Sequence, residues 1–380
     1  MCCMFNCNKG CFRKINRNED LFYFKCSHRM GVFFMLLINF FIWHFTSQSL
    51  HTFHPVIDLL LHLLCKPTKK LVIFTISEIL ITSPFTLQIM NTYLAETELI
   101  LNKNGSVYHL KLLPEQVCEN IIVVGDPGRV KTVSSFFDIV DLKIHNREFV
   151  THGGTYRGKR VMAVSSGIGT DNIDILMNEL DAAVNIDLTT RRVKEKHTAL
   201  NIVRLGTSGA LQAAIPVNGL VITEYALGFD GLLNYYADLH TINETDLSAA
   251  FIQHSKWSTA LPFPYAVKGS EHLFQKLGED CIPGITATAP GFYAPQGRSL
   301  RLKPWTHDFN RQLTDFRYAD KCITNFEMET SALYGLGKLL GHHACAICVI
   351  IANRITKTYS SNFASSMNGL IEVTLQRLTK

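Results

Sequence analysis

The sequence predicts an α/β fold with a mixed or parallel central sheet. Short, fully apolar runs typical of strands buried on both faces alternate with segments whose apolar residues recur at helical spacing. Glycine-containing turns follow several of these apolar runs. Because alternating strands and helices pack as helices over a sheet, we expect ligands to bind where the strands end.

The first predicted strand and helix units lie between residues 121 and 184. A buried strand is expected at 121–124, followed by a glycine turn at 125–129 and a helix at 130–137. A second strand is expected at 161–165, before a helix that Asp171 or Asn172 caps. The apolar residues on one face of that helix are Ile173, Leu176 or Met177, Leu180 and Val184.

The remaining elements continue the alternation. Strands are expected at 202–205, 220–223 and 344–352. The segment 328–340 is expected to be a helix that ends at Gly341 and turns inward three leucines, Leu333, Leu336 and Leu340. We find no internal repeat or linker in residues 90–380, which are predicted to form one domain.

Charge separates the first 89 residues from the rest of the chain. The 380-residue chain has a formal net charge of +5. Residues 1–89 contain nine Lys/Arg and four Asp/Glu, whereas residues 90–380 contain 28 of each. The main body is therefore neutral, without the basic bias of a nucleic-acid-binding domain, and any anion must be held by individually placed arginines.

Residues 1–89 are a hydrophobic, cysteine-rich extension that we expect to lie outside the main fold. Six of the 11 cysteines fall within residues 1–65. The apolar run 31–43 follows basic residues, as in a targeting segment, but is shorter than the roughly 20 residues that span a bilayer. Three interpretations stay open: a membrane or targeting segment, an extra subdomain, or upstream translation before a working start at Met90. We favour the last, with a cytoplasmic protein.

Two further groups could suggest metal or redox chemistry. Cys345 and Cys348 have the spacing of a redox or metal pair, but positions three apart in a strand face opposite sides. We therefore expect reduced, buried thiols. His342 and His343 follow a predicted helix, where histidines commonly interact with the helix dipole, so metal binding is not expected there.

Two arginine-bearing glycine turns predict an oxyanion site. In the first, Gly125 allows close approach of the backbone, Pro127 stiffens the turn, and Arg129 follows. In the second, Arg204 precedes Thr207, which adds a hydroxyl donor. Exposed backbone N–H groups and two forked guanidinium groups suit a phosphate. Gly-Asp-Pro-Gly by itself could be only a tight turn, and the 167–169 turn lacks the third glycine of a dinucleotide fingerprint.

With these motifs the chain resembles the nucleoside phosphorylases of the uridine phosphorylase type. The resemblance runs from about Val107 to Arg354 and rests on eight short motifs in order. They are VYHL at 107–110, GDPGR at 125–129, HNREF at 145–149, SGIG at 166–169, RLGTSG at 204–209, FYAPQGR at 292–298, NFEME at 325–329 and NR at 353–354. One motif is weak evidence, but the ordered set is strong. It implies a single-domain, three-layer α/β/α fold with a mixed central sheet.

The resemblance implies roles for residues at the phosphate end. The phosphate-binding residues would be Gly125, Arg129, Arg204 and Thr207. From a neighbouring subunit, Arg147 would reach the phosphate and His109 the ribose. Glu148 matches the position that binds a monovalent cation, such as potassium, between subunits in some members. A homo-oligomer, a dimer or a hexamer, follows from these shared sites.

The resemblance also implies roles at the sugar and base end. Met328 and Glu329 would hold the sugar, with Glu329 accepting hydrogen bonds from its 2′- and 3′-hydroxyls. Residues expected near the base are Phe292, Gln296 and Arg298, with Arg354 close behind. Arg204, Thr207 and Glu329 would act directly in catalysis. Glu327 could instead be a structural hydrogen-bond acceptor.

The implied reaction is phosphorolysis of a pyrimidine nucleoside, with uridine favoured, to a free base and a (deoxy)ribose 1-phosphate. Phosphate is then the co-substrate, and no organic cofactor is required. Purine-using relatives typically carry an aspartate after the late strand, where this chain reads Ala352-Asn353-Arg354. A purine nucleoside phosphorylase, a hydrolytic nucleosidase and a non-catalytic nucleoside-binding protein stay open as alternatives. The segments 185–198 and 235–264 depart from the family pattern.

Overall fold

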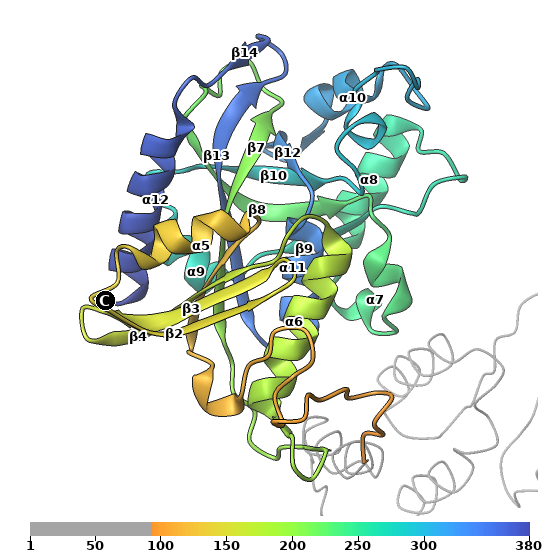
Figure 1. Cartoon of the computed structure of the whole chain (residues 1–380). Coiled ribbons are helices and arrows are strands. Elements are labelled where there is room, and N and C mark those ends of the chain that lie inside the picture. Colours follow the sequence, from red (N-terminus) through yellow and green to blue (C-terminus); the bar gives the residue numbers. More distant parts are fainter. Residues whose placement is uncertain (1–92) are drawn as a thin grey trace, which may run out of the picture. The chain divides into compact units, whose positions relative to one another are not determined.

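One large mixed sheet organises the part of the chain that the computed structural model describes, residues 93–380 (Figure 1). Our predictions for residues 1–89 lie outside the described residues. Within residues 93–380, none of the helices is both long and apolar enough to cross a membrane.

The sheet has 12 strands in the order β11-β12-β10-β8-β13-β7-β1-β4-β3-β2, with β14 paired to β13 and β9 to β8. The strands are β1 Asn120–Val124, β2 Ile139–Asn146, β3 Phe149–Tyr156, β4 Lys159–Ser165, β7 Asn201–Ala210, β8 Leu220–Gly228, β9 Tyr265–Lys268, β10 Ile282–Thr288, β11 Arg317–Tyr318, β12 Lys321–Glu327, β13 His343–Asn353 and β14 Thr358–Tyr359. β1 runs parallel to β4 and β7, whereas β3 runs antiparallel to β4. The sheet is therefore mixed, as the sequence predicts.

Five strands close into a ring, because β12 pairs with β7 as well as with β10. A buried polar chain crosses four strands of this ring. Thr223 meets Thr286 at 2.6 Å, Thr286 donates to the Asn325 amide oxygen at 2.8 Å, and the Asn325 nitrogen donates to Ser208 at 2.9 Å. Satisfied buried polar groups fix one arrangement of neighbouring strands. The chain thereby sets how β7 and β12, which carry predicted site residues, lie against each other.

Helices cover both faces of the sheet. They are α5 Pro127–Ser134, α6 Thr170–Asn185, α7 Leu239–Ile242, α8 Thr245–Ser255, α9 Glu271–Leu277, α10 Phe309–Asp315, α11 Thr330–Leu339 and α12 Phe363–Leu378. The side chains of β1 alternate between two apolar cores, one containing residues of α6 and α11 and the other residues of α5, α9 and α12. This arrangement gives the predicted layers of helix, sheet and helix.

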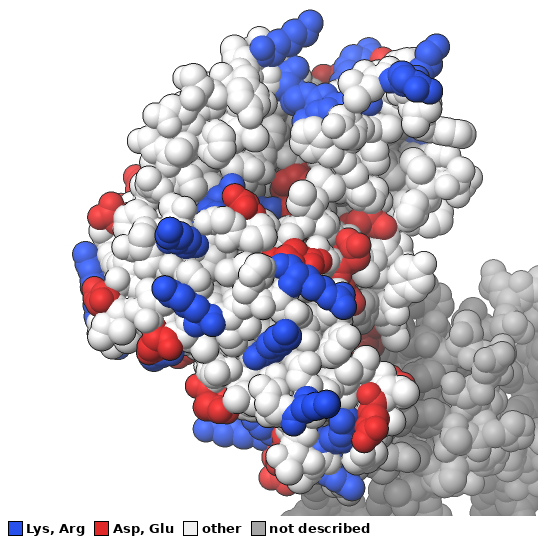
Figure 2. Space-filling view, in the orientation of Figure 1, with Lys and Arg blue, Asp and Glu red and all other residues white. Residues whose placement is uncertain are grey.

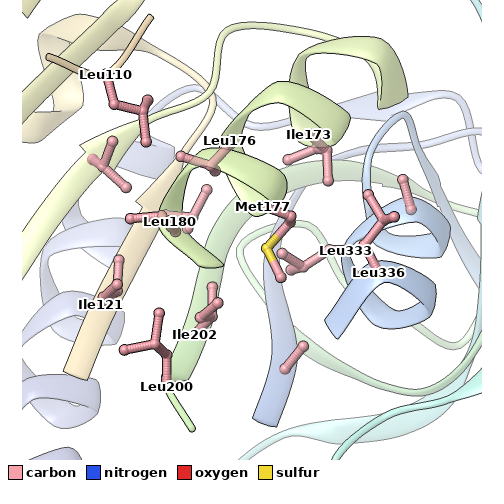
Figure 3. Packing of buried hydrophobic residues seen from close by; sticks show 14 of the residues in the cluster. Leu110, Ile121, Ile173, Leu176, Met177, Leu180, Leu200, Ile202, Leu333 and Leu336 are labelled. Carbon is pink, nitrogen blue, oxygen red and sulfur yellow. The ribbon is translucent and has the colours of Figure 1, made fainter. Parts of the chain in front are cut away.

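The packing of α6 follows the predicted apolar face (Figure 3). Ile173, Leu176, Met177 and Leu180 are all fully buried, and Val184 packs at the edge of the same core. Burial of each such side chain contributes about 1.5–3 kcal/mol. Leu333 and Leu336 of α11 lie in the same core. The helix spacing read from the sequence therefore identified the buried faces.

Three helix starts differ from the sequence prediction. α5 begins at Pro127, three residues early, because Asp126 caps it by accepting the Gly128 N–H at 2.9 Å. α6 begins after Gly169, not after Asp171 or Asn172, and has no side-chain cap. α11 begins at Thr330 instead of 328, because the N–H groups of residues 329 and 330 bond to the Glu327 carboxylate. Each start depends on a turn or a distant group that helical periodicity does not reveal.

The charged segment 185–198, which departs from the family pattern, folds as a small hairpin of β5 Ile186–Asp187 and β6 Arg192–Val193. Arg191 of this hairpin donates to the Leu99 carbonyl at 2.6 Å. The Leu94 N–H donates to the Arg191 carbonyl at 2.9 Å. The hairpin therefore holds the first described segment of the chain.

Candidate functional site

The predicted anion-binding turns lie next to each other because β1 and β7 are parallel neighbours. Val123 pairs with Arg204 in the register of the two strands, so Gly125 follows β1 beside the middle of β7. A Cβ at Gly125 would lie 3.3 Å from the Gly167 carbonyl oxygen. Glycine turns after β1 and β4 are thus packed together at the carboxyl ends of the strands, as expected for a site on an α/β sheet.

Arg204 is the central charged residue of this site. Its side chain is buried, and one guanidinium nitrogen contacts the Glu329 carboxylate, while another lies 3.5 Å from Glu327. Its Nε has no hydrogen-bond partner among the described residues. The two carboxylates raise the pKa of Arg204 against the opposing effect of burial. A permanently charged donor is therefore fixed in contact with Glu329.

Arg129 approaches Arg204 from the first turn of α5. Burial lowers the pKa of Arg129, and the like charge of Arg204 adds to this effect. Its Nη1 donates to the Leu205 carbonyl at 3.3 Å, which holds the guanidinium against β7. Two cations held close together repel each other, and an anion between them would relieve that repulsion. The arrangement suits a phosphate.

Glu329 connects this anion end to α6. Its Oε1 accepts the Gly169 N–H at 2.9 Å, while its Oε2 faces Arg204. Burial raises the pKa of Glu329, reinforced by Glu327, although Arg204 lowers it. Both oxygens are thus oriented by groups that are more than one hundred residues away in sequence, and the carboxylate can accept further hydrogen bonds.

Glu327 has the structural role that the sequence left open for it. Its carboxylate accepts the N–H groups of Glu329 and Thr330 at 2.9 and 3.0 Å and the Thr288 hydroxyl at 2.6 Å. It therefore caps α11 from within the chain and positions both Glu329 and Arg204. The sequence shows the two carboxylates but not which of them accepts the N–H groups at the start of α11, since both are buried.

Thr207 and Met328 are both half-buried beside these residues in the chain. Thr207 pairs with Val349 in the β7–β13 register, three residues after Arg204. Met328 separates the two carboxylates and belongs to none of the apolar cores of residues 93–380.

The predicted base-recognition residues form a second cluster. The Arg298 guanidinium carbon lies 3.7 Å from the centre of the Phe292 ring, and its Nη1 donates to Gln296 Oε1 at 2.6 Å. Burial and the like charge of Arg354 lower the pKa of Arg298 to about 10. The structure therefore brings Arg354 to the same cluster as the 292–298 turn.

β7 links the two clusters. The Arg354 N–H donates to the Ala210 carbonyl at 2.9 Å, at the end of β7. A Cβ at Gly209 would lie 3.6 Å from Arg354 Cγ. From Arg204 through Thr207 to Gly209, one strand therefore runs from the anion cluster to the base cluster. Figure 2 shows the surface hollowed in the upper middle of this face, with acidic and basic groups at the bottom of the hollow.

His109, Arg147 and Glu148 lie around the β2–β3 turn. Glu179 of α6 accepts the backbone N–H groups of His109 and Leu110 and lies 2.6 Å from His109 Nδ1. Arg147 is exposed at a φ of 55°. Glu148 packs against Gly167, where a Cβ would lie 3.0 Å from Glu148 Cγ. The sequence did not predict the contacts between Glu179 and His109, because Glu179 lies in a segment with an ordinary helical pattern.

A separate group of Asp181, His197 and His342 has donor atoms within 4.8 Å of one another. His342 Nδ1 accepts the Leu200 N–H at 3.2 Å, so a neutral ring carries its proton on Nε2, which lies 3.2 Å from Asp181 but has no hydrogen-bond partner among the described residues. A metal would need that nitrogen unprotonated. The tautomer therefore favours a structural histidine, held through Nδ1 by the Leu200 N–H, over a metal ligand.

The cysteines of the predicted CxxC pair have different surroundings. Cys345 packs in an apolar core, whereas Cys348 Sγ lies 3.7 Å from Arg204. Both are free, and burial raises the pKa of each thiol, to about 12 for Cys345 and about 11 for Cys348. They are buried thiols, as the sequence predicts.

The chain belongs to the phosphorylase superfamily, whose family model matches residues 119–372. Uridine phosphorylase of Thermococcus kodakarensis is 30% identical over 260 residues, which cover 68% of this chain and 81% of that protein. A DeoD-type purine nucleoside phosphorylase of Listeria welshimeri is 26% identical over 276 residues, covering 72% of this chain and 99% of the relative.

Solved structures agree with this assignment. The Trypanosoma brucei nucleoside phosphorylase, described as showing uridine phosphorylase activity, superposes with a TM-score of 0.68 at 27% identity. The match covers 74% of this chain and 99% of that one. Purine nucleoside phosphorylase of Toxoplasma gondii, at 19% identity and a TM-score of 0.52 over 73% of this chain and 97% of that one, shares the fold.

Proposed function

We propose that this protein is a pentosyltransferase that cleaves a pyrimidine nucleoside, with uridine favoured, by phosphorolysis. The observation that carries the proposal is the convergence of Arg129 and Arg204 beside the Glu329 carboxylate. Two cations from different turns supply a phosphate site, and the carboxylate next to them supplies acceptors for sugar hydroxyls. The similarity to uridine phosphorylases supports the same activity.

In this mechanism the sugar gains positive charge as the bond to the base breaks. Phosphate held by Arg129, Arg204, Thr207 and the Gly125 turn stabilises that charge and attacks the anomeric carbon. Glu329 fixes the sugar hydroxyls, and Met328 packs against the ring. The base leaves with negative charge, which the Arg298 guanidinium and the Gln296 amide stabilise as donors. The catalytic gain comes from placing phosphate and sugar in line.

The reaction class is tested by measuring release of uracil from uridine with and without inorganic phosphate. We expect release only with phosphate, together with formation of ribose 1-phosphate. Equal release in both conditions would instead identify a hydrolytic nucleosidase. Binding of uridine without release in either condition would indicate a nucleoside-binding protein.

Base preference is supported by the loop after β13. The Asn353 nitrogen donates to the carbonyls of Gln212 and Ile215 at 2.9 and 2.8 Å, and its oxygen accepts the Ile355 N–H at 2.9 Å. This amide is used to join the end of β13 to the segment after β7, and the next residue is Arg354 instead of an acid. Uridine should therefore be cleaved faster than inosine, with thymidine as the third substrate of the comparison.

Shared active sites in a homo-oligomer, a dimer or a hexamer, are part of the proposal. Arg147 is exposed, and matches the family position that reaches a neighbour's phosphate. His109 likewise matches the position that contacts a neighbour's ribose. Mixing inactive Arg147→Ala and Arg204→Ala subunits should restore some activity, since mixed pairs contain intact sites. Activity no higher than that of the separate variants would argue for self-contained subunits.

A monovalent cation at Glu148 and a cytoplasmic location complete the proposal. Glu148 matches the family position that binds a monovalent cation between subunits in some members. Replacing potassium with a bulky organic cation should lower the activity or the melting temperature of the parent but not of Glu148→Ala. The free cysteines of residues 93–380 are typical of a reducing compartment. Cell fractionation tests the location.

A further inference from the structure

Asn310, near the start of α10, bridges two parts of the base-recognition cluster. With its amide oxygen toward Arg354, that oxygen accepts from Arg354 Nη2 at 3.1 Å. The amide nitrogen then donates to the Gln296 carbonyl at 3.2 Å. This orientation satisfies both ends of the amide, which is how amide orientations are assigned. The amide therefore ties the loop after β13 to the 292–298 turn.

The contact with the turn is close because Gly297 has no side chain. Gly297 has a φ of 66°, and a Cβ there would lie 2.8 Å from both the nitrogen and the oxygen of the Asn310 amide. The Phe309 ring, next in sequence, packs against the Phe229 and Trp257 rings with centroid distances of 5.6 and 6.0 Å. Asn310 therefore lies on a helix that is held by aromatic packing, and it contacts the turn that carries Gln296 and Arg298.

Arg354 needs such a partner. It lies close enough to Arg298 for the like charges to lower the pKa of Arg298, and burial lowers the pKa of Arg354 itself. Its Nη1 is buried without a hydrogen-bond partner among residues 93–380. Without a neutral acceptor, repulsion from Arg298 would favour a conformation of this long side chain that points away from the cluster. Asn310 supplies that acceptor without cancelling the positive charge.

We propose that Asn310 is a positioning residue that holds Arg354 against the base-recognition turn and thereby tunes stabilisation of the departing base. The inference rests on the proposed function, because a leaving pyrimidine gains negative charge only as its glycosidic bond breaks. Two guanidinium groups held at that cluster favour the transition state over the ground state. Asn310 itself does not touch the reacting atoms.

The first test is a double-mutant cycle between Asn310→Ala and Arg354→Ala, measured as kcat/KM for uridine. Each single variant should lose about tenfold, the scale of one hydrogen bond to a charged group. Asn310→Ala should cost nothing further in the Arg354→Ala background, because Asn310 acts through Arg354. Additive losses, or an Asn310→Ala variant as active as the parent, would overturn the proposal.

The second test uses leaving-group acidity, a readout that a merely structural role would not move. 5-Fluorouridine releases a more acidic base and needs less stabilisation of the leaving anion. Asn310→Ala should therefore lose less kcat with 5-fluorouridine than with uridine. Equal losses with both substrates would contradict the inference. Arg311→Ala, an exposed neighbour on α10, is the matched control and should behave like the parent with both substrates.

Two further measurements distinguish loss of the positioning role from misfolding of Asn310→Ala and from failure of the proposed function. If Asn310→Ala does not fold, Asn310→Asp keeps the side-chain volume but neutralises Arg354, and the same substrate-dependent loss is expected. If the parent releases no base with phosphate, the proposed function fails, and binding of the uracil anion, measured by calorimetry at alkaline pH, then tests Asn310 without turnover. Binding should weaken in Asn310→Ala and Arg354→Ala, and no further in the double variant. Unchanged binding would refute the positioning role as well.

Discussion

At the scale of single residues, Arg129 and Arg204 have similar predicted roles but different surroundings. Arg204 is enclosed with Glu327 and Glu329, so its charge balances two buried carboxylates. Arg129 contacts a carbonyl and faces the like charge of Arg204. Arg204 therefore stabilises the fold as well as contributing to the proposed anion site, whereas Arg129 carries a repulsion that a bound anion would remove.

The first prediction contrasts the two arginines. Arg204→Ala should lose activity and about 3–5 kcal/mol of stability, because it leaves buried carboxylates without their cation. Arg129→Ala should raise the KM for phosphate while the melting temperature without phosphate stays the same or rises. Calorimetric unfolding of both variants and phosphate titrations of the parent and of Arg129→Ala check this.

Phosphate binding provides a second comparison of the parent with Arg129→Ala. Saturating phosphate should raise the melting temperature of the parent, because it binds only the folded state. The rise should be smaller in Arg129→Ala. An equal rise in the two proteins would place phosphate elsewhere.

At the scale of elements, the start of α6 connects helix geometry to the sugar end of the site. Gly169 precedes the helix at φ 100° and ψ 162°, a region almost restricted to glycine, and its N–H bonds to Glu329. The helix start thus depends on backbone freedom and a long-range hydrogen bond. The Asp171 and Asn172 side chains, which looked like caps in the sequence, do not cap it.

The second prediction follows from that geometry. Gly169→Ala should cost about 1–3 kcal/mol of stability and also raise the KM for the nucleoside, because the N–H that orients Glu329 shifts. Gly158→Ala is the control, since Gly158 also has a positive φ of 72° but lies in an exposed hairpin turn with nothing within 4 Å of the added Cβ. Gly158→Ala should lose some stability but keep the parental KM for the nucleoside. If Gly169→Ala kept the parental KM for the nucleoside, the start of α6 would have no role in sugar binding.

The attachment of α5 to β3 should depend on pH. Ser134 of α5 meets His152 Nδ1 at 2.7 Å, and burial, with the nearby charge of Lys143, lowers the pKa of His152. A lowered folded-state pKa favours the neutral ring, so its contribution to stability is full above the unfolded value of about 6.5 and is lost as pH falls below it. α5 also carries Arg129, which couples this contact to the anion site.

The third prediction is that acidification from about pH 7.5 to about pH 5 lowers the melting temperature of the parent more than that of His152→Gln. Glutamine can still bond to Ser134 but does not titrate. Parallel curves for the two proteins would show that His152 does not contribute to the acid sensitivity.

At the scale of the whole molecule, the sheet joins site residues that are distant in sequence. Each strand of the ring from β7 to β12 is held on both sides, and the polar chain from Thr223 to Ser208 crosses four of them. All of these elements lie within residues 93–380, and the family match spans 119–372. Both clusters of the candidate site are therefore assembled from this part of the chain.

The fourth prediction is that a protein starting at Met90 folds and keeps the phosphate-dependent release of base. Its melting temperature and kcat/KM should equal those of the full chain, since the residues proposed for the site all follow position 90. Loss of folding or activity on removing residues 1–89 would show that the extension belongs to the working protein.

Local features of this protein follow from its amino-acid pattern. The runs at 121–124 and 161–165 are strands, the apolar face of α6 is buried as expected, and Gly341 ends α11 in a left-handed turn. Periodic burial and the conformational freedom of glycine act over a few residues, so they can be read from neighbouring positions. The motifs also named the arginines and carboxylates of the candidate site.

The contacts between those groups depend on the folded arrangement of the strands. The contacts of Arg204 with Glu329 and of Asn310 with Arg354, and the choice of Glu327 over Glu329 as the cap of α11, depend on the order and register of strands. A strand pairing brings together residues far apart in the chain, and no local pattern encodes which strands become neighbours. The sequence therefore named the chemical groups, while the sheet set their geometry.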